Sequence, residues 1–133
     1  MPSKKLYMEK EGEGTALSLE ATILGRDINV VLSGGIPHIG CTVISQPRLS
    51  LTGDDSASCT TSVINVTGHK DDVICRMVSE RLCREFQCTV VCSGGFHIDA
   101  IMPEQISAVQ RLAQDALEGL VERLQEIYPL EEL

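Results

Sequence analysis

Aromatic side chains are scarce in this chain: it has no Trp, two Phe and two Tyr among 133 residues. Its core must therefore be built from Val, Ile, Leu, Ala, Met and Cys. The chain has enough of them, since 43% of its residues are hydrophobic, and this share excludes a disordered polypeptide. Stacking of a flat ligand on aromatic rings is correspondingly disfavoured.

Basic residues are also in the minority, with 11 Lys and Arg against 19 Asp and Glu and a net charge of −8. A broad nucleic-acid surface needs clustered Lys and Arg, so we expect no nucleic-acid partner. An anionic ligand would have to be bound locally, by a metal, a helix N-terminus or a few placed cations.

Long apolar runs are missing as well. No segment approaches the ~20 apolar residues of a membrane helix, and no apolar signal-peptide core follows Met1–Lys5. We therefore expect a cytoplasmic protein that does not interact with membranes. The six cysteines contain no C-x-x-C pair, and several lie in segments that read as buried, which favours reduced core residues over disulfides or ligands.

No signature of catalysis is present. The chain lacks G-x-S-x-G, H-E-x-x-H and a Walker loop, so no catalytic residue can be named. A non-catalytic binding protein fits the sequence as well as an enzyme does.

Hydrophobic periodicity predicts one α+β domain over residues 1–133, a mostly antiparallel sheet with two helices packed on it. Residues 1–12 and 129–133 are expected to be flexible ends. The predicted strands are Leu17–Leu24, Ile28–Leu32, Ile39–Ser45, Ala57–Thr67 and Thr89–Cys92, with a turn at Gly25–Asp27 and a loop at Gln46–Ser56. The predicted helices are Asp71–Phe86 and Pro103–Ile127.

The second helix suggests a homodimer. A helix of about 25 residues is about 37 Å long at about 1.5 Å per residue, which exceeds the width of a small sheet. Its wide apolar stripe could cover its own sheet alone, or it could also contact a symmetry mate.

One pattern occurs twice. Val30–His38 reads V-V-L-S-G-G-I-P-H and Val90–His97 reads V-V-C-S-G-G-F-H. Each copy could be a plain turn, since Ser and Gly are ordinary turn residues. If the two copies lie side by side, His38 and His97 could face one pocket, and with Asp99 they could bind Zn, Mn or Fe.

A third candidate is the stretch Gly68-His69-Lys70, which joins a predicted strand to a helix N-terminus. Exposed N–H groups, the helix dipole and the Lys70 ammonium suit a phosphate. The alternative is a simply capped helix, with Asp71 as N-cap.

The two Ser-Gly-Gly segments and T-S-V-I-N-V-T-G-H-K-D-D resemble the small LpdD-type proteins that accompany UbiD-type decarboxylases. The resemblance spans about residues 16–124. It implies a fold similar to proteasome-assembly chaperones, usually as a homodimer. It also implies a non-catalytic chaperone or carrier of prenylated flavin mononucleotide (or FMN), with a UbiD-type decarboxylase as partner.

A ligand with one phosphate and a flat ring fits the candidate residues. The cofactor site expected from the resemblance and the motifs comprises Ser33, Gly34, Gly35, His38, Gly68, His69, Lys70, Ser93, Gly94, Gly95 and His97. A divalent metal held by His38, His97 and Asp99 is a further expectation. The Gly-Gly segments would let the backbone approach the ring.

Two other functions stay open. The chain could be an obligate small subunit of a gallate-type decarboxylase. It could also be a pure protein-assembly module, in which the Gly-Gly segments are turns and the long helix is a docking face.

Overall fold

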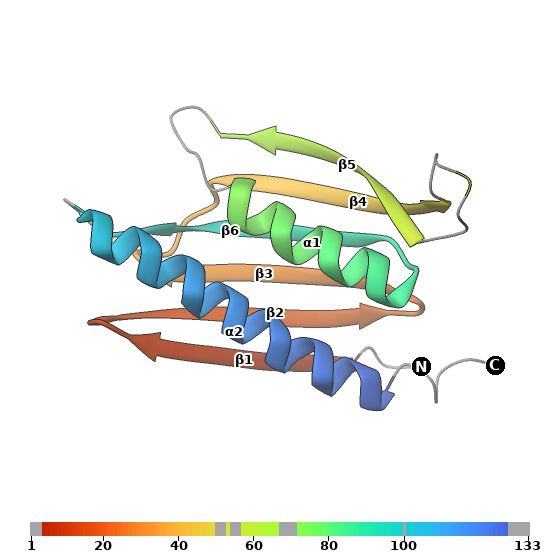
Figure 1. Cartoon of the computed structure of the whole chain (residues 1–133), viewed down its shortest axis with the longest axis horizontal. Helices are drawn as coiled ribbons and strands as arrows, with labels where there is room; N and C mark the ends of the chain where they lie inside the picture. Colours follow the sequence, from red (N-terminus) through yellow and green to blue (C-terminus); the bar gives the residue numbers. More distant parts are fainter. Residues whose placement is uncertain (1–3, 50–52, 54–56, 67–71, 100, 128–133) are drawn as a thin grey trace.

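A computed structural model describes residues 4–49, 53, 57–66, 72–99 and 101–127 of the chain. The described residues form one α+β domain with six strands and two helices (Figure 1). The strands are β1 (Lys4–Gly12), β2 (Thr15–Leu24), β3 (Asp27–Gly35), β4 (Cys41–Leu49), β5 (Ala57–Asn65) and β6 (Val90–His97). The helices are α1 (Asp72–Phe86) and α2 (Pro103–Ile127). The predicted fold class is confirmed.

The strands form a single sheet in the order β1-β2-β3-β6-β4-β5. Neighbouring strands are antiparallel except for β3 and β6, which are parallel. The chain reaches this parallel pairing because β6 follows α1 and enters the sheet between β3 and β4. Two segments that lie 60 residues apart in the sequence therefore become neighbours in the middle of the sheet.

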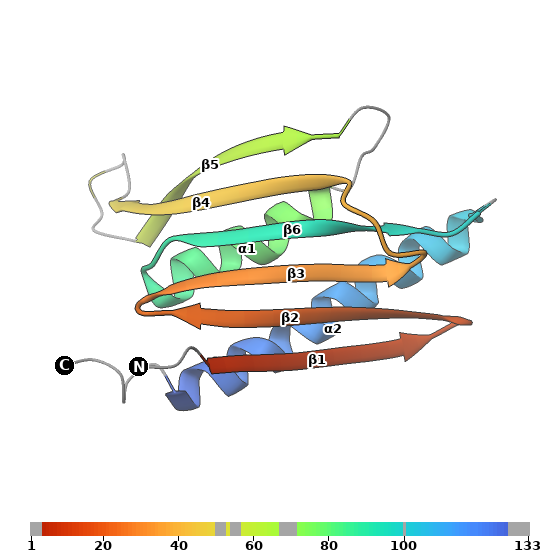
Figure 2. The ribbon, with the colours of Figure 1, turned by 180° about the vertical axis from the view of Figure 1, so that it is seen from behind.

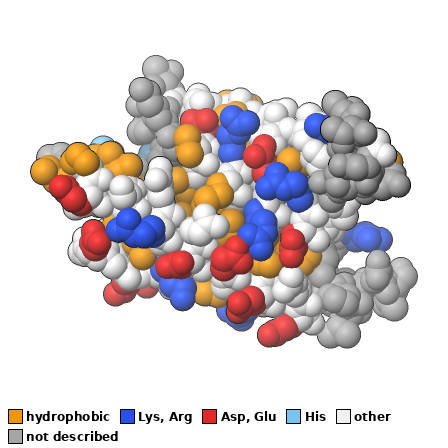
Figure 3. Space-filling model, viewed as in Figure 1, with side chains coloured by type: hydrophobic (Ala, Val, Ile, Leu, Met, Phe, Trp, Pro, Cys, Tyr) orange, Lys and Arg blue, Asp and Glu red, His pale blue; other side chains and the backbone are white. Residues whose placement is uncertain are grey.

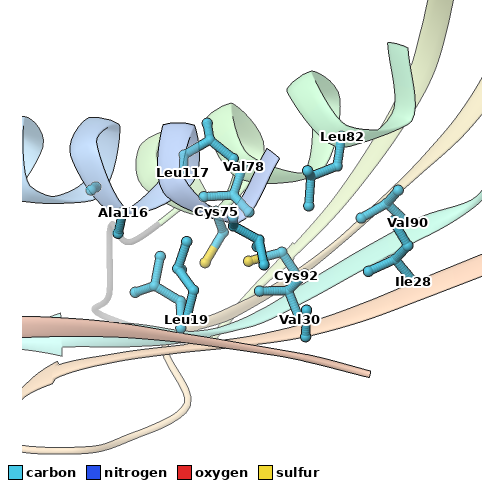
Figure 4. Packing of buried hydrophobic residues seen from close by; sticks show 14 of the residues in the cluster. Leu19, Ile28, Val30, Cys75, Val78, Leu82, Val90, Cys92, Ala116 and Leu117 are labelled. Atoms are coloured by element: carbon cyan, nitrogen blue, oxygen red, sulfur yellow. The ribbon is translucent and has the colours of Figure 1, made fainter. Parts of the chain in front are cut away.

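Both helices lie on the same face of the sheet (Figure 1), and the hydrophobic core fills the space between them and the strands (Figure 4). Helix α1 packs on β4, β5 and β6, while α2 packs on β1 and β2. Strand β2 shows how the sequence produces this layer, because Leu17, Leu19, Ala21 and Ile23 alternate with more exposed residues and are all buried. The opposite face carries no helix among the residues that the structure describes (Figure 2).

The apolar stripe of α2 is covered by its own chain. The helix runs obliquely over the sheet (Figure 1), which accommodates its length. The buried residues of α2 are Ala108, Val109, Leu112, Ala113, Ala116, Leu117, Leu120, Val121 and Leu124. The length of this helix therefore does not require a second subunit.

Helix α2 begins with a capping arrangement. The Gln105 side chain accepts a hydrogen bond from the Met102 N–H at 2.8 Å, and the Gln105 N–H donates to the Met102 carbonyl at 2.9 Å. The Gln105 side chain thus supplies the half of a capping box that satisfies the Met102 N–H, and Pro103 takes the first helical position. Helix α1 ends at Phe86 and is followed by Gln87, which takes a left-handed conformation with φ 53° and donates its N–H to the Cys83 carbonyl at 2.9 Å.

Three predictions about the strands are wrong. Residues Lys4–Gly12, expected as part of a flexible end, form β1 and pair with β2 along its length. Residues Gln46–Leu49, expected as a loop, continue β4 instead. Pro47 lies opposite Cys59 in the pairing with β5 and does not end the strand. The predicted strand Thr89–Cys92 is too short, because β6 continues to His97. The predicted end at 129–133 lies outside the described residues.

Candidate functional site

The parallel pair β3–β6 brings the two Ser-Gly-Gly segments together. Both segments lie inside strands, so their interpretation as turns is wrong. Ser33 is paired with Gly95 and Gly35 with His97, so the second copy is displaced by two residues relative to the first. The two histidines that follow these segments consequently meet at one end of the sheet, as the sequence analysis predicted for strands lying side by side.

His38 and His97 lie edge to face, with 6.0 Å between their ring centroids. The His38 Nδ1 is 3.2 Å from the Ile36 carbonyl oxygen, and the His97 Nε2 is 2.9 Å from Asp99 Oδ1. The His97 side chain is 47% exposed and that of Asp99 85%. The His97 ring is thus accessible from solvent. Each ring is held by one contact, His38 by the Ile36 carbonyl and His97 by Asp99.

These contacts orient the imidazoles. An N–H at His38 Nδ1 donates to the Ile36 carbonyl, and an N–H at His97 Nε2 donates to Asp99. In the neutral rings, Nε2 of His38 and Nδ1 of His97 are then the acceptor nitrogens. Protonation turns both into donors, which suits an anionic group.

The glycines of the two segments are required by the sheet itself. A Cβ on Gly34 would lie 2.3 Å from Phe96 Cδ2, one on Gly35 2.0 Å from the His97 carbonyl oxygen, and one on Gly94 1.8 Å from the Leu32 carbonyl oxygen. Gly35 and Gly94 also have positive φ values of 63° and 132°. The backbone of the neighbouring strand fills the space beside Gly35 and Gly94, and the Phe96 ring fills that beside Gly34, so the need for glycine at these positions does not by itself indicate a ligand.

Exposed hydrophobic side chains lie at the same end of the molecule as the histidines. Ile36 is 52% exposed and Ile39 66%, in the segment that carries His38, and Met102 is 56% and Ile106 47% exposed where α2 begins. Figure 3 shows hydrophobic side chains gathered at this end of the molecule. The Ile36 N–H donates to the His97 carbonyl at 2.8 Å, which joins the two histidine segments. We call Ile36, Ile39, Met102 and Ile106 the apolar end.

No sequence motif marks the apolar end. The one feature of the sequence that points to it is the presence of apolar residues in segments predicted as loops, where polar residues are usual. Ile106 lies in a helix most of whose other apolar residues belong to the core, and Met102 lies directly before that helix.

A hollow lies beside the Ser-Gly-Gly segment of β3. It has a volume of about 340 Å³ and is lined by Glu9, Gly14, Thr15, Ala16, Ser18, Ser33, Gly34 and Gly35. Small-molecule sites usually measure about 300–1,000 Å³, so the hollow is at the lower limit. Its hydroxyl groups suit hydrogen bonds to a ring, whereas the Glu9 carboxylate disfavours a phosphate.

A metal site is not evident. Two imidazoles and a carboxylate are donors that Zn, Mn and Fe accept. Within the described residues, however, no group of three or more His, Cys, Asp or Glu side chains is arranged to hold a metal ion. The Asp99 carboxylate instead binds the His97 ring.

The third candidate, Gly68-His69-Lys70, lies outside the described residues. The chain before it is described as far as Val66, whose N–H donates to the Gly40 carbonyl at 2.8 Å. Gly40 in turn donates to the Gly94 carbonyl at 2.8 Å. The described chain on the N-terminal side of this motif therefore ends beside the segments that carry His38 and His97.

The cysteines are core residues, as predicted. Five of the six are buried and Cys59 is half-buried. Burial raises the pKa of the Cys83 thiol to about 12, so this side chain stays protonated and weakly nucleophilic at neutral pH. None of the described helices is long and apolar enough to cross a membrane.

Comparisons with known proteins agree with the resemblance noted in the sequence. The family model for the prenylated flavin chaperone LpdD-like domain matches residues 11–125. A chain in the crystal structure of a novel chaperone complex for yeast 20S proteasome assembly is similar in fold, with a TM-score of 0.53 over 98% of each chain and 13% sequence identity. At this identity the similarity concerns the fold alone. No curated protein matches the sequence.

Proposed function

The chain belongs to the family of LpdD-like prenylated flavin chaperone domains, and we propose that it binds prenylated FMN at the His38–His97 end and delivers it to a UbiD-type decarboxylase. It catalyses no reaction of its own in this proposal, because the difficult chemistry resides in the cofactor within the partner enzyme. The chain contributes binding and protection of the ring.

One observation carries the proposal. The half-buried imidazole of His38 and the exposed imidazole of His97 lie 6.0 Å apart at the end of the sheet, and exposed aliphatic side chains occur in the same segments and where α2 begins. Solvent-exposed apolar side chains that gather around a few polar groups are typical of a binding site. A flat ring that carries polar atoms and a phosphate is complementary to such a surface.

The residues present suit the two parts of the cofactor differently. The aliphatic side chains of the apolar end can cover a ring without aromatic stacking. The phosphate needs a cation, and residues 36–40, 96–99 and 101–106 contain neither Lys nor Arg. The ring nitrogens of His38 and His97 are one candidate to bond the phosphate, and Lys70 with the N–H groups of Gly68 and His69 is the other.

The remaining predicted residues have supporting roles in this proposal. Ser33 and Ser93 are half-buried in neighbouring strands, and Ser33 lines the hollow. The sheet at the site is shaped by Gly34, Gly35, Gly94 and Gly95. At Gly34, Gly35 and Gly94 a Cβ would lie too close to neighbouring atoms. Asp99 orients His97 and is not assigned a metal.

Binding is the first test. Purified protein is titrated with reduced and with oxidised prenylated FMN, and binding is followed by fluorescence and native mass spectrometry. We expect the double variant H38A/H97A to weaken binding by about 10- to 100-fold, the effect of losing a hydrogen bond to a charged group. Gln110→Ala, at an exposed position of α2, is the control and should bind as the wild type does.

The outcome separates the alternatives. No binding by the wild-type protein would refute a flavin carrier. Unchanged binding in H38A/H97A would move the site away from the histidines, and a comparison with H69A/K70A would then test the phosphate candidate. Elemental analysis of freshly isolated protein tests whether a divalent metal accompanies the cofactor.

The role toward the decarboxylase is tested with the enzyme pair. A carrier should raise the activity of the apo-decarboxylase when it is loaded with prenylated FMN, and should separate from it during size-exclusion chromatography. A stable stoichiometric complex whose turnover stops when the small chain is removed would identify an obligate subunit instead.

A further inference from the structure

The two edges of the sheet differ in how they are protected. Strand β1 forms one edge and β5 the other (Figure 1). Because an edge strand presents unpaired N–H and C=O groups, proteins commonly protect it with charged residues, above all Lys, or with Pro. Five of the nine residues of β1 are charged, and three of these are lysines. Strand β5, A-S-C-T-T-S-V-I-N, has no charged residue and no Pro, so its edge is open to pairing with another strand.

The outward main-chain groups of β5 can be assigned to particular residues. The N–H of Val66, directly after the strand, donates to the Gly40 carbonyl and so points toward β4. Along an extended strand, the main-chain groups of successive residues point to opposite sides. Those of Val63, Thr61 and Cys59 therefore point away from β4, to the side on which no described strand pairs with β5.

Arginine side chains reach β5 on both faces of the sheet. Arg84 of α1 donates from Nη1 to Cys59 Sγ at 3.9 Å, on the face that the helices cover. Arg48 of β4 donates from Nε to Thr60 Oγ1 at 3.0 Å, on the opposite face, because successive side chains of a strand alternate. Both guanidinium groups bond to neutral atoms, so in this chain with a net charge of −8 their positive charge is available to carboxylates of a partner.

The other end of β5 lies beside the candidate cofactor site. Val66 is bonded to Gly40, which follows His38 by two residues. Ile64 and Val66 are 73% and 45% exposed, so this end of the strand is apolar and open to solvent. A strand that paired with β5 would lie about 4.8 Å from it and would place its own chain next to the segment that carries His38.

We propose that the β5 edge binds an extended acidic segment of the partner decarboxylase, which adds to the sheet as a further strand. In such strand addition, main-chain hydrogen bonds supply affinity and side chains supply specificity. Two consecutive acidic residues in the segment would direct one carboxylate to Arg84 and the other to Arg48, because neighbouring side chains point to opposite faces. The proposal rests on the proposed function for the identity of the partner, and it names the surface that holds this partner while the cofactor is transferred.

Hydrogen exchange of the full chain, alone and with the apo-decarboxylase, tests the proposal by mass spectrometry. The partner should slow exchange of the β5 amides by about tenfold or more, while the amides of β1, the internal control, should exchange as before. A complex that leaves β5 unprotected would overturn this inference and leave the flavin carrier intact. Absence of any complex would overturn both this inference and delivery to the decarboxylase, whereas flavin titration tests binding separately. Protection of β5 in the chain alone that increases with concentration would assign the edge to a second copy and overturn the proposal.

Charge reversal tests the two arginines. Arg48→Glu and Arg84→Glu should each raise the dissociation constant for the apo-decarboxylase by about tenfold or more, because each loses a charge-assisted hydrogen bond and gains repulsion. Arg26→Glu makes the same change of charge at the exposed turn between β2 and β3, and it should change the constant by less than about twofold. Circular dichroism verifies folding of each variant. Unchanged affinity in folded Arg48→Glu and Arg84→Glu, or an equal loss in Arg26→Glu, would overturn the proposal.

Discussion

At the scale of single residues, the glycines of the repeated segment show how one feature can have two explanations. From the sequence, Gly-Gly next to a histidine suggests a backbone that a ligand can approach. In the structure, the position that a Cβ would occupy at Gly94 is 1.8 Å from the Leu32 carbonyl oxygen of the neighbouring strand. The requirement for glycine there comes from the parallel pairing, and the ligand-binding role passes to the histidines and the exposed aliphatic side chains.

This difference can be measured by replacing glycines one at a time. Gly94→Ala should destabilise the protein by about 3 kcal/mol or more, since both the contact with a backbone oxygen and the φ of 132° oppose a side chain. Gly25→Ala should cost only about 1–2 kcal/mol, since Gly25 has φ 64° and no atom within 4 Å of its Cβ position. Urea unfolding gives both values, and equal losses would contradict a packing role for Gly94.

At the scale of elements, the two helices are tied to each other by polar side chains. Arg81 of α1 forms a bidentate pair with Glu118 of α2, and Gln125 of α2 donates to Glu85 of α1 at 2.9 Å. Below them, the hydroxyl of Ser79 donates to Ser45 at 2.7 Å and so fixes α1 over β4. Apolar packing places the helices on the sheet, and these contacts select their relative positions.

The Arg81–Glu118 pair predicts a specific pH dependence. The hydrogen bond from Arg81 lowers the pKa of the Glu118 carboxyl below its ordinary value of 4.5. The folded state therefore keeps the carboxylate to lower pH than the unfolded chain, so its stabilisation is present above pH 4.5 and is lost as the pH falls through the lowered pKa. At pH 7 the wild type should unfold at a higher urea concentration than E118Q. This difference between the two urea midpoints should shrink as the solution is acidified.

The matched control for this prediction is E122Q, which removes an exposed carboxylate from the same helix. Added salt should reduce the effect of E118Q, because the pair is partly exposed and screened. A difference that stays constant from pH 7 to acid would show that the carboxylate charge of Glu118 does not contribute.

At the scale of the whole molecule, one core joins both helices to the sheet. Residues from α1, α2 and every strand except β5 belong to the same buried cluster, including Leu6, Cys41, Leu82, Cys92 and Leu124, and half-buried residues of β5 pack against it. A single contiguous core in a chain of this size should unfold cooperatively, and the buried cysteines distributed over it can report that transition.

Thiol alkylation tests this cooperativity. In native protein we expect Cys59 to react first, because it is half-buried while the other five cysteines are buried, and a C59S variant should lack the fast phase. The five buried thiols should become reactive over the same range of urea in which circular dichroism is lost, as mass spectrometry of the alkylated peptides can determine. A subset that reacts at lower urea would reveal a separately unfolding part of the chain.

The sequence by itself determined most of the elements and the fold class. Alternation in β2 and the helical spacing of apolar residues in α1 and α2 are local signals, and they predicted those segments without knowledge of the rest of the chain. The resemblance carried by the repeated motif was confirmed by the family match over residues 11–125.

Only the tertiary structure decided how these elements are combined. The entry of β6 between β3 and β4 depends on contacts between distant segments, which no local pattern encodes. This strand order pairs the two Ser-Gly-Gly segments inside β3 and β6, and it brings His38 close to His97. The packing of both helices on one face of the sheet is likewise a long-range outcome. Periodicity shows which side of a helix or strand is apolar. Which other element packs against that side depends on the free energy of the whole fold.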